Sequence, residues 1–408
     1  MTAREYPVFT VTPKAERSLR AGHPWVYGEE VTAVEGAYQN GDMVDVVSNK
    51  GRYLGTGWVN DHSKIRVRII SRNANDTFDE AFFRRRVCYA LNYRKTVMGS
   101  VDYRCCRLIF GEADQFPGLT VDRFENILVT QVLSLGMERR KDWVYRALVE
   151  LLREDGEQID AIYERNDVAI RTLEGLEQGK GFYQMEGLKT DLSGHVTITE
   201  NRIKYDVDYI EGQKTGFFLD QKYNRQAAAK LARGRRVLDC FTHTGAFALN
   251  AAAAGAEHVT AVDVSAFALE LAAENGKRNG LTNLDYKCAD VFDLLTEMAK
   301  EKKCDYDYII LDPPAFTKSR ATAKNAYHGY KEINRKAMQL LPRGGYLATC
   351  SCSHFMTDEM FRKMLREAAL DAGVTLRQIE ARQQAPDHPI LPEVPETDYL
   401  KFYLLQVV

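Results

Sequence analysis

The feature that most constrains the fold is a regular alternation of short apolar strands with longer helices, which begins near Arg236. Such an alternation favours an α/β fold, in which a parallel sheet carries right-handed crossovers and helices on both faces. The predicted strands are Val237–Phe241, His258–Val264, Leu284–Cys288, Tyr308–Leu311 and Tyr346–Cys350, and the predicted helices cover residues 245–254, 266–279, 291–301, 322–340 and 357–371. Two last strands, Thr375–Ala381 and Tyr399–Val408, have no helix between them and are expected to pair as an antiparallel edge.

The rest of the chain has two other patterns. Short strands punctuated by glycine predict a small β barrel at the N-terminus: Met43–Val47, Tyr53–Val59 and Lys64–Ile70. The middle part is predicted to be α+β, with helices over 78–100 and 138–153 and strand-like runs at Leu108–Thr130 and Ile162–Leu173. A chain of 408 residues suits two or three domains at roughly 150 residues each. We therefore predict a small β-barrel domain over 1–75, a central α+β domain over 76–195 and a Rossmann-like domain over 196–408.

Composition excludes several classes of protein. With 45% hydrophobic and 27% charged residues, and no apolar run near the roughly 18 residues that span a bilayer, the chain is expected to be a cytoplasmic protein without membrane contact. Its eight cysteines lack the spacing of a disulfide framework and are expected to be reduced. A net charge of -2 argues against a wholly basic nucleic-acid surface, although a local one is possible. Basic residues do gather in one stretch, where a solvated helix face is the simpler interpretation: Arg84, Arg85, Arg86, Arg94, Lys95, Arg104 and Arg107.

Acidic residues follow three successive strands of the predicted sheet. Asp239, Asp263 and Asp290 end these strands, and ligands of such sheets lie at the carboxyl ends of the strands. Asp263 is placed to accept from both ribose hydroxyls, and Asp290 from an adenine amino group. Each acid alone is also explained as a strand end or helix cap, but three together favour a ligand site. The turn after the first strand is expected to line the same ligand through Phe241, Thr244 and Gly245.

The first turn separates two cofactor classes. A dinucleotide needs a G-x-G-x-x-G turn around its pyrophosphate, and residues 239–247 contain a single glycine. S-adenosylmethionine has no phosphate, and its cationic methionine end suits a turn that contains Asp239. The sequence therefore predicts a methyltransferase. A dehydrogenase and a non-catalytic RNA-binding protein remain as alternatives.

The fourth and fifth strands end in residues suited to the reaction. Asp312 faces the cofactor edge, and Pro313 and Pro314 stiffen a turn that, with Phe316, would form a wall for a planar base. Cys352 follows the fifth strand in Thr349–His354 and is a candidate nucleophile, because a thiolate can add to C6 of a pyrimidine and activate C5. Cys350 lies within the strand and fits a buried inert thiol. No second ligand pair accompanies the Cys-x-Cys-x-His segment, so no metal is predicted.

These residues resemble a known family, the bacterial methyltransferases with an N-terminal PUA domain that make 5-methylcytosine in 23S ribosomal RNA. The resemblance lies in Gly22–Tyr27, Arg107–Asp114 with Pro117–Leu119, Lys214–Gln221 with Arg225, and the Asp-Pro-Pro and Ser-Cys-Ser segments. It covers nearly the whole chain. Ala315 stands where the two-cysteine class of RNA cytosine methyltransferases has a second cysteine.

The resemblance implies roles for further residues. It places the nucleophile at Cys352 rather than Cys350, and implies that Phe218, Gln221 and Arg225 close over S-adenosylmethionine, beside Asp312. A 23S rRNA partner follows, with a homodimer as a possibility. Enzymes of this architecture that methylate N7 of guanine remain the alternative for the product. The residues expected to contact RNA are His23, Trp25, Tyr27, Pro314 and Phe316.

Overall fold

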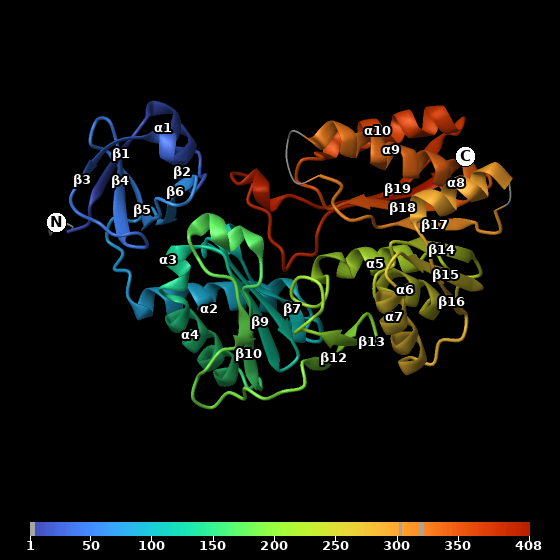
Figure 1. Ribbon diagram of the computed structural model, residues 1–408, viewed down its shortest axis with the longest axis horizontal. Coiled ribbons are helices and arrows are strands. Elements are labelled where there is room, and N and C mark those ends of the chain that lie inside the picture. The colour runs from blue at the N-terminus through green and yellow to red at the C-terminus, as the bar shows by residue number, and fades with distance from the viewer. Residues whose placement is uncertain (1–4, 302–303, 318–321) are drawn as a thin grey trace. The chain divides into compact units, whose positions relative to one another are not determined.

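The structure is a computed structural model that describes residues 5–301, 304–317 and 322–408 (Figure 1). The first four residues of the predicted barrel domain, and residues 302–303 and 318–321 of the predicted C-terminal domain, lie outside the described residues. The chain forms two compact units. The N-terminal unit contains Met1–Ile198, Val207–Leu219 and Pro386–Thr397, and the C-terminal unit contains Thr199–Asp206, Asp220–Ala385 and Asp398–Val408. The predicted boundaries after residues 75 and 195 stay a prediction.

The N-terminal unit begins with a six-stranded sheet around a small apolar core. Its elements are β1 (Val8–Val11), α1 (Pro13–Arg20), β2 (Trp25–Tyr27), β3 (Val31–Glu35), β4 (Met43–Ser48), β5 (Tyr53–Val59) and β6 (Ile65–Ser71), in the strand order β2-β6-β5-β4-β1-β3. Alternate residues such as Val44 and Val46 point into the core, as the period of a strand requires. The three strands predicted here agree with the structure within one residue.

A second sheet in this unit follows the order β11-β10-β9-β8-β7. Its strands are β7 (Cys105–Phe110), β8 (Leu119–Phe124), β9 (Ile127–Val132), β10 (Ala161–Arg165) and β11 (Lys180–Phe182), and its helices are α2 (Glu80–Val97), α3 (Leu135–Glu138) and α4 (Lys141–Glu154). The predicted strand-like run Ile162–Leu173 is wrong beyond Arg165. Residues 169–174 form a short 3-10 helix instead, because Arg171 turns inward and binds Glu138 through Nη1 and Oε2, 3.0 Å apart.

The two parts of this unit meet where a glycine leaves room for a tryptophan. Trp58 of β5 is 1% exposed, and a Cβ atom added to Gly136 of α3 would lie 1.9 Å from its Cγ. The guanidinium of Arg140 lies 5.7 Å from the centre of a Trp58 ring. Trp58 therefore packs between β5 and α3, outside the apolar core cluster of the first sheet, and its packing depends on the missing side chain at position 136.

The C-terminal unit contains a seven-stranded sheet with the order β16-β15-β14-β17-β18-β20-β19. The strands are β14 (Arg236–Cys240), β15 (His258–Asp263), β16 (Leu284–Cys288), β17 (Tyr308–Leu311), β18 (Tyr346–Ser351), β19 (Leu376–Arg382) and β20 (Lys401–Val407). The first five are parallel, as predicted. The last two do pair antiparallel, but β20 also pairs antiparallel with β18 and so lies inside the sheet, leaving β19 at the edge.

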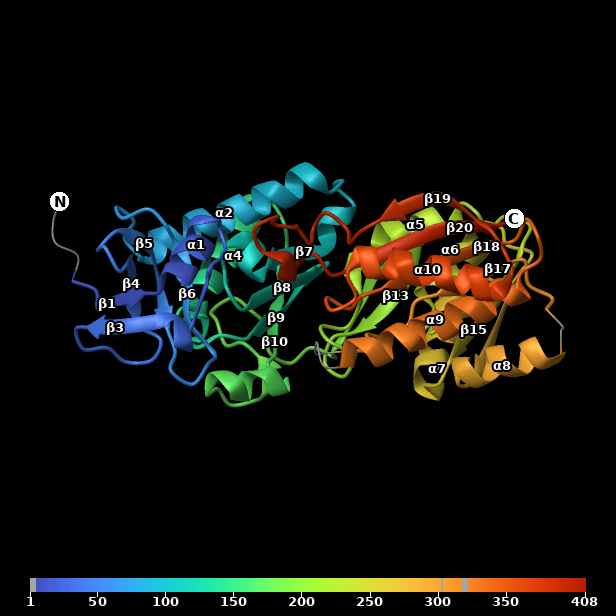
Figure 2. The ribbon, with the colours of Figure 1, turned by 90° about the horizontal axis from the view of Figure 1, so that it is seen from above.

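Helices cover both faces of this sheet (Figures 1 and 2). They are α5 (Lys222–Ala229), α6 (Ala246–Ala253), α7 (Ala266–Arg278), α8 (Val291–Glu301), α9 (Ala323–Leu340) and α10 (Asp358–Ala372). Alternation along β17 separates the two cores, since Tyr308 and Ile310 pack against residues of α5 and α6, whereas Ile309 and Leu311 pack against α8, α9 and α10. A hairpin of β12 (His195–Glu200) and β13 (Ile203–Asp208) precedes the sheet along the chain. The Rossmann-like prediction is confirmed.

No helix among the described residues is both long and apolar enough to cross a membrane.

Candidate active site

The strand order brings the predicted site residues to one edge of the sheet. Strand β14 lies between β15 and β17, so the order of the strands reverses there, and ligands of such sheets bind beyond the carboxyl ends at this point. Asp263 is the last residue of β15, Asp312 follows β17, and Cys352 follows β18. Because the first five strands are parallel, all of these positions are at the same edge.

The turn after β14 is held in an unusual backbone conformation. Phe241 has φ of 63°, His243 has φ of 52° and Gly245 has φ of 84°, so two residues with side chains occupy the left-handed region that favours glycine. A Cβ atom at Gly245 would lie 3.0 Å from both Ala272 Cβ and Leu249 Cδ1. Strain of this kind is concentrated at ligand sites. Phe241 and Gly245 were predicted here, whereas the strain at Phe241 and His243 has no signal in the sequence.

Asp239 is a fully buried carboxylate with one oxygen left over. Its Oδ2 accepts from Thr242 Oγ1 at 2.6 Å and from the Ala248 amide at 2.9 Å, while Oδ1 is buried and has no hydrogen-bond partner among the residues that the structure describes. Burial raises the pKa of Asp239 to about 7, and the negative charge of Asp312 adds to this effect. A buried acceptor without a partner is costly, so the site fits a ligand that brings a donor or a positive charge. The sulfonium and ammonium of S-adenosylmethionine meet this requirement.

The other two predicted acids bind backbone amides. Asp263 accepts from the His243 amide through Oδ2 at 2.9 Å and from the Ser265 amide through Oδ1 at 3.0 Å. Asp290 is exposed, and its Oδ1 accepts from the Phe292 and Asp293 amides at 2.8 and 3.1 Å, so it caps helix α8. Asp263 thereby fixes the strained turn and, being half-buried, retains lone pairs that can accept from ribose hydroxyls. The adenine role of Asp290 stays a prediction.

Three side chains join the ends of β17 and β18. Gln221 Nε2 donates to Asp312 Oδ1 at 3.1 Å and lies 3.4 Å from Cys350 Sγ, and its Oε1 accepts from Asn224 Nδ2 at 2.6 Å. Cys350 Sγ lies 2.8 Å from Asp312 Oδ1. Burial, together with the adjacent carboxylate of Asp312, raises the pKa of the Cys350 thiol well above its ordinary value. Cys350 is therefore a protonated donor to Asp312.

Cys352 differs from Cys350 in its surroundings. It is half-buried rather than buried, and its Sγ lies 4.0 Å from the carbonyl oxygen of Pro313. The neighbouring Ser353 Oγ donates to the Thr317 carbonyl at 3.1 Å, so the turn after β18 is bound to the segment after β17. The predicted nucleophile thus lies beside the predicted proline wall.

The two residues predicted to support the target base, Pro314 and Phe316, differ in their exposure. Pro314 is exposed, whereas Phe316 is half-buried in an aromatic cluster with ring centroids 6.5 Å from Phe241, 5.7 Å from Phe292 and 4.6 Å from Tyr330. Phe316 therefore also contributes to the core below the site edge. Contact of either residue with RNA stays a prediction.

Two residues predicted from the closing segment have other partners. Arg225 is 2% exposed and forms a two-pronged ion pair with buried Glu200, at 2.6 Å for Nε–Oε1 and 2.8 Å for Nη2–Oε2. Phe218 belongs to the N-terminal unit, where the Lys214 ammonium lies 4.7 Å from its ring centroid. Direct contact of these two side chains with the cofactor stays a prediction. The sequence did not reveal Glu200, because it lies 25 positions before its partner in a different element.

The predicted RNA-contacting aromatic residues form a row in the N-terminal unit. His23, Trp25 and Tyr27 alternate along and before β2, with ring centroids 5.2 and 6.5 Å apart. All three are half-buried, and Trp25 Nε1 donates to Glu112 Oε1 at 3.0 Å. Trp25 is therefore not a fully buried core residue, so its ring retains exposed surface.

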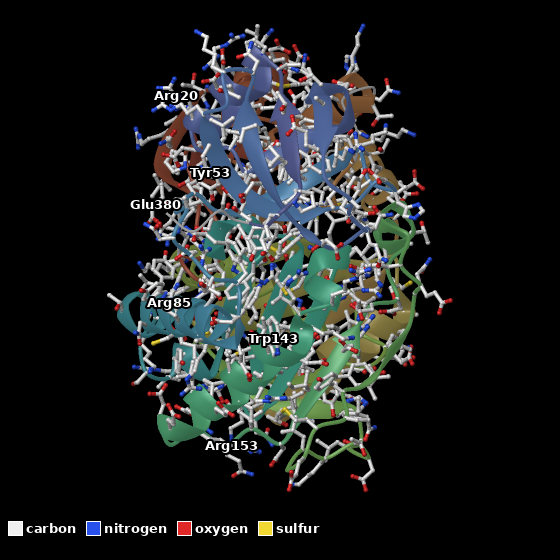
Figure 3. All side chains as sticks on the ribbon, turned by 90° about the vertical axis from the view of Figure 1, so that its left-hand side faces the viewer. Arg20, Tyr53, Arg85, Trp143, Arg153 and Glu380 are labelled. Atoms are coloured by element: carbon white, nitrogen blue, oxygen red, sulfur yellow. The ribbon has the colours of Figure 1, made fainter. Side chains whose placement is uncertain are left out.

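The stretch of basic residues near α2 is mostly neutralised by acids. It is not one solvated helix face, because Arg94 is buried and Arg107 lies on β7. One of its members, Arg85, is labelled in Figure 3. The ion pairs are Arg84 with Glu150 and Glu154, Arg85 with Asp76, Arg94 with Asp114, Lys95 with Asp155, Arg104 with Glu125, and Arg107 with Asp122. Within the described chain, Arg86 is the member of this stretch without such a carboxylate.

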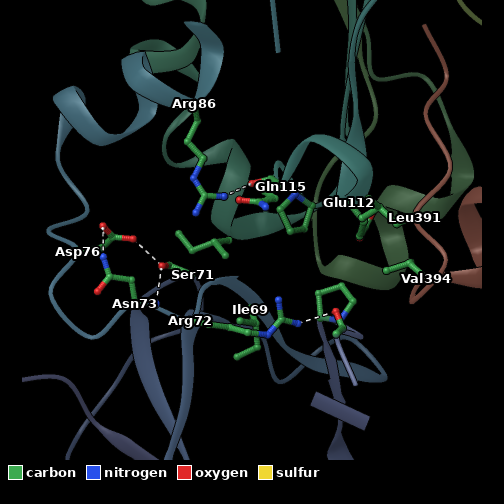
Figure 4. A pocket seen from close by; sticks show the side chains of 14 residues that line it. Ile69, Ser71, Arg72, Asn73, Asp76, Arg86, Glu112, Gln115, Leu391 and Val394 are labelled. Carbon is green, nitrogen blue, oxygen red and sulfur yellow. Dashed lines mark hydrogen bonds between the residues drawn. The ribbon is translucent and has the colours of Figure 1, made fainter. Parts of the chain in front are cut away.

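Arg86 instead lines a pocket of about 330 Å³ in the N-terminal unit (Figure 4). Its Nη1 lies 3.5 Å from the Gln115 carbonyl oxygen, and burial lowers its pKa to about 10. Arg72 enters the pocket from the opposite side, where its Nη2 donates to the Gly22 carbonyl at 2.5 Å (Figure 4). Two guanidinium groups therefore face one polar cavity, which Asp76 and Glu112 also line. The described residues contain no group of three or more His, Cys, Asp or Glu side chains that could hold a metal ion.

Comparisons with known proteins agree with both halves of this description. A family model described as a PUA-like domain matches residues 9–72, and one described as an S-adenosylmethionine-dependent methyltransferase matches residues 183–405. Proteins named ribosomal RNA large subunit methyltransferase I from Aeromonas salmonicida and Shewanella denitrificans are each 42% identical to this chain. The matches cover 95% and 97% of this chain, and 96% and 98% of those proteins.

The fold also resembles solved structures. A putative S-adenosylmethionine-dependent methyltransferase from Streptococcus mutans superposes with a TM-score of 0.81, at 22% identity, over 98% of this chain and all of that one. At this identity the likeness concerns the fold, and it extends over both units.

Proposed function

Because this chain belongs to the ribosomal RNA large subunit methyltransferase I family, whose members depend on S-adenosylmethionine, we propose that it methylates C5 of a cytosine in 23S ribosomal RNA. The observation that carries this proposal is the half-buried Cys352 at the carboxyl end of β18, beside the Asp312–Pro314 turn. A methyltransferase acting on a ring nitrogen needs no thiol there, since that nitrogen is already nucleophilic.

The cofactor is proposed to lie across the strand ends. Asp239 would hold the positively charged methionine end, Asp263 the ribose, and the turn from Phe241 to Gly245 would approach the ligand with its backbone. When bound, S-adenosylmethionine supplies an electrophilic methyl group on a positively charged sulfur. Asp312 and Gln221, which hydrogen-bond to each other, would line the same edge.

The proposed chemistry uses the thiolate of Cys352. Its Sγ adds to C6 of the cytosine, and the electron pair of the C5–C6 double bond makes C5 nucleophilic. C5 would then take the methyl group as the bond from that carbon to the sulfonium sulfur breaks, and S-adenosylhomocysteine would leave with the bonding electron pair. After methylation the C5 proton passes to a base, the double bond re-forms, and the Sγ–C6 bond breaks to restore the thiolate. The target base must leave its stack to reach the thiol, which the exposed Pro314 and the neighbouring aromatic cluster would then support.

The contrast with Cys350 supports this assignment. A nucleophilic cysteine reacts as the thiolate and must be accessible. Cys350 is 1% exposed and its thiol donates to Asp312, so burial and hydrogen bonding both oppose its reactivity. Cys352 meets the requirement for access.

The N-terminal unit is proposed to bind the rRNA. The pocket between Arg72 and Arg86 would take a backbone phosphate, because a guanidinium pairs with phosphate oxygens through two donors. The row His23, Trp25 and Tyr27 would contact unstacked bases. Such a substrate implies a cytoplasmic site of action. The homodimer stays a prediction, which the molar mass in solution from light scattering would check.

The covalent step has a direct test. An RNA fragment containing 5-azacytosine at the target position should form a protein–RNA adduct with the wild type, because C5 is replaced by nitrogen and the thioether is not released. Cys352→Ala should form none, and Cys350→Ala should still form it. Trapping by Cys352→Ala would contradict the assignment, and methylation of guanine N7 in 23S rRNA would replace the proposed product.

The phosphate pocket has its own test. Affinity for an rRNA fragment should fall with salt, and the slope of log K against log salt should decrease by about one for each phosphate that the protein no longer neutralises. The variant Arg72→Ala/Arg86→Ala is expected to lower this slope by about one, and Arg85→Ala, beside Asp76, serves as the control. An unchanged slope in the double variant would exclude the pocket.

A further inference from the structure

A lysine of β20 is buried beside the turn that carries Cys352. Lys401 is 4% exposed and pairs in register with Ser351 of β18, the residue before Cys352. Its Nζ donates to the carbonyl oxygen of Ser353 at 2.7 Å and to that of Tyr399 at 2.9 Å. Its ammonium group thus binds the backbone carbonyl of the residue that follows Cys352.

This cation lacks the carboxylate partner that buried lysines usually have. Among the described residues, no carboxylate lies within ion-pair distance of Lys401, and two carbonyl groups occupy two of its three donors. Lys336 offers a contrast, since its buried ammonium lies 3.0 Å from Glu332 Oε1. A buried charge without an opposite charge is unfavourable, because its desolvation is not compensated. Such a cost points to a use for the charge.

We propose that Lys401 is a positioning residue, which holds the turn from Ser351 to Ser353 in place and stabilises the thiolate form of Cys352. The inference rests on the proposed role of Cys352 as nucleophile. Lys401 does not contact the substrate in this proposal. It acts through the backbone carbonyl that follows Cys352 and through its positive charge, which is felt strongly in a poorly solvated site.

The groups that face Lys401 are consistent with this role. Asp398 precedes β20, Asp358 begins α10, and Cys350 and Cys352 belong to β18 and its turn; all four raise the pKa of Lys401. Burial is the larger effect and lowers that pKa to about 8, so the ammonium form still predominates at pH 7. Asp358 hydrogen-bonds to Tyr403, and Cys350 is a protonated donor to Asp312. After burial, Asp398 is the largest influence on Lys401 and Cys352 is the next, so Cys352 is the thiol that interacts most strongly with its charge.

The test measures the ionisation of Cys352 without relying on methylation. The full-length protein is alkylated with iodoacetamide at pH 6 to 10, and the modified peptide containing Cys352 is quantified by mass spectrometry. Lys401→Met should shift the midpoint of this profile upward by about one pH unit, a tenfold loss of thiolate at fixed pH. Lys401→Arg should restore most of the shift, because it keeps the charge. Lys336→Met, the matched control, should leave the midpoint unchanged.

A second variant keeps the inference falsifiable if Lys401→Met fails to fold. Asp398→Asn removes a negative charge near Lys401, so it should shift the Cys352 midpoint downward, opposite to Lys401→Met. A folded Lys401→Met with the wild-type midpoint, or an Asp398→Asn variant shifted upward, would overturn the inference. Loss of the proposed nucleophile role is seen separately, as methylation retained by Cys352→Ala, and does not alter the alkylation profiles of the lysine variants.

Discussion

Replacing Asp239 by asparagine should make the protein relatively more stable as the pH rises, while weakening S-adenosylmethionine binding. Asp239 is fully buried, and its pKa of about 7 lies above the ordinary value of 3.8. At about 1.4 kcal/mol per pKa unit, ionising this carboxylate inside the fold costs roughly 4 kcal/mol. The amide of asparagine has a similar shape and is never ionised.

The sign of the effect follows from proton linkage. The folded state binds the Asp239 proton more tightly than the unfolded state, so wild-type stability falls as the pH rises from about 4 to about 7 and is constant beyond. Part of the cost of ionising Asp239 is already present at pH 5. The wild type should therefore lose about 2–3 kcal/mol of folding stability through this group between pH 5 and pH 8. For a unit of this size that equals roughly 5–10 °C in Tm. The difference in Tm, wild type minus Asp239→Asn, should therefore fall by this amount when the pH is raised from 5 to 8.

Thermal unfolding followed by circular dichroism at both pH values measures this difference. Asp290→Asn is the matched control, because the same substitution is made at an exposed helix cap where asparagine also caps well. The difference in Tm between Asp290→Asn and the wild type should be nearly the same at pH 5 and pH 8. Calorimetry at pH 8 should show at least tenfold weaker S-adenosylmethionine binding by Asp239→Asn. A Tm difference that is equal at pH 5 and pH 8 would refute the account of Asp239 as a buried, costly charge.

Three further changes test other parts of the structure. Gly136→Ala places a methyl group against Trp58 and should lower the free energy of unfolding by about 1–3 kcal/mol, measured by urea denaturation; an unchanged value would show that α3 moves freely. Glu200→Gln leaves the buried Arg225 without its carboxylate and should cost about 3–5 kcal/mol in the same assay, whereas a neutral result would mean that Arg225 finds another partner. Asp263→Ala removes the acceptor of the His243 amide and should weaken S-adenosylmethionine binding at least tenfold by calorimetry, which equal affinities would contradict.

The sheet was predictable because its signal is local. Most strands of the alternating region are short apolar runs, each of the five parallel strands is followed by a helix, and the bounds of β16 and β17 agree with the prediction residue for residue. The place of β20 was not predictable in the same way. Antiparallel pairing with β19 follows from the missing helix, but insertion between β18 and β19 depends on pairing between Tyr346–Ser351 and Lys401–Gln406, which are far apart in the sequence.

The candidate active site also contains some residues that the sequence could reveal and others that it could not. Asp239, Asp263 and Asp312 were found because parallel strands bring their carboxyl ends together, so position along the strand was sufficient. Phe241 and His243 have positive φ angles, which residues with side chains rarely adopt, and no sequence pattern predicts them. Lys401 lies in an ordinary strand sequence, and its relevance emerges only when β20 pairs with β18.

The central claim is methyl transfer to C5 of cytosine in 23S rRNA, and mass spectrometry of the RNA product tests it most directly. Unmodified 23S rRNA is incubated with the protein and isotopically labelled S-adenosylmethionine, digested to nucleosides and analysed, with Cys352→Ala in parallel. The account predicts labelled 5-methylcytidine from the wild type and none from the variant. Label in 7-methylguanosine, or equal amounts of 5-methylcytidine from both proteins, would contradict it.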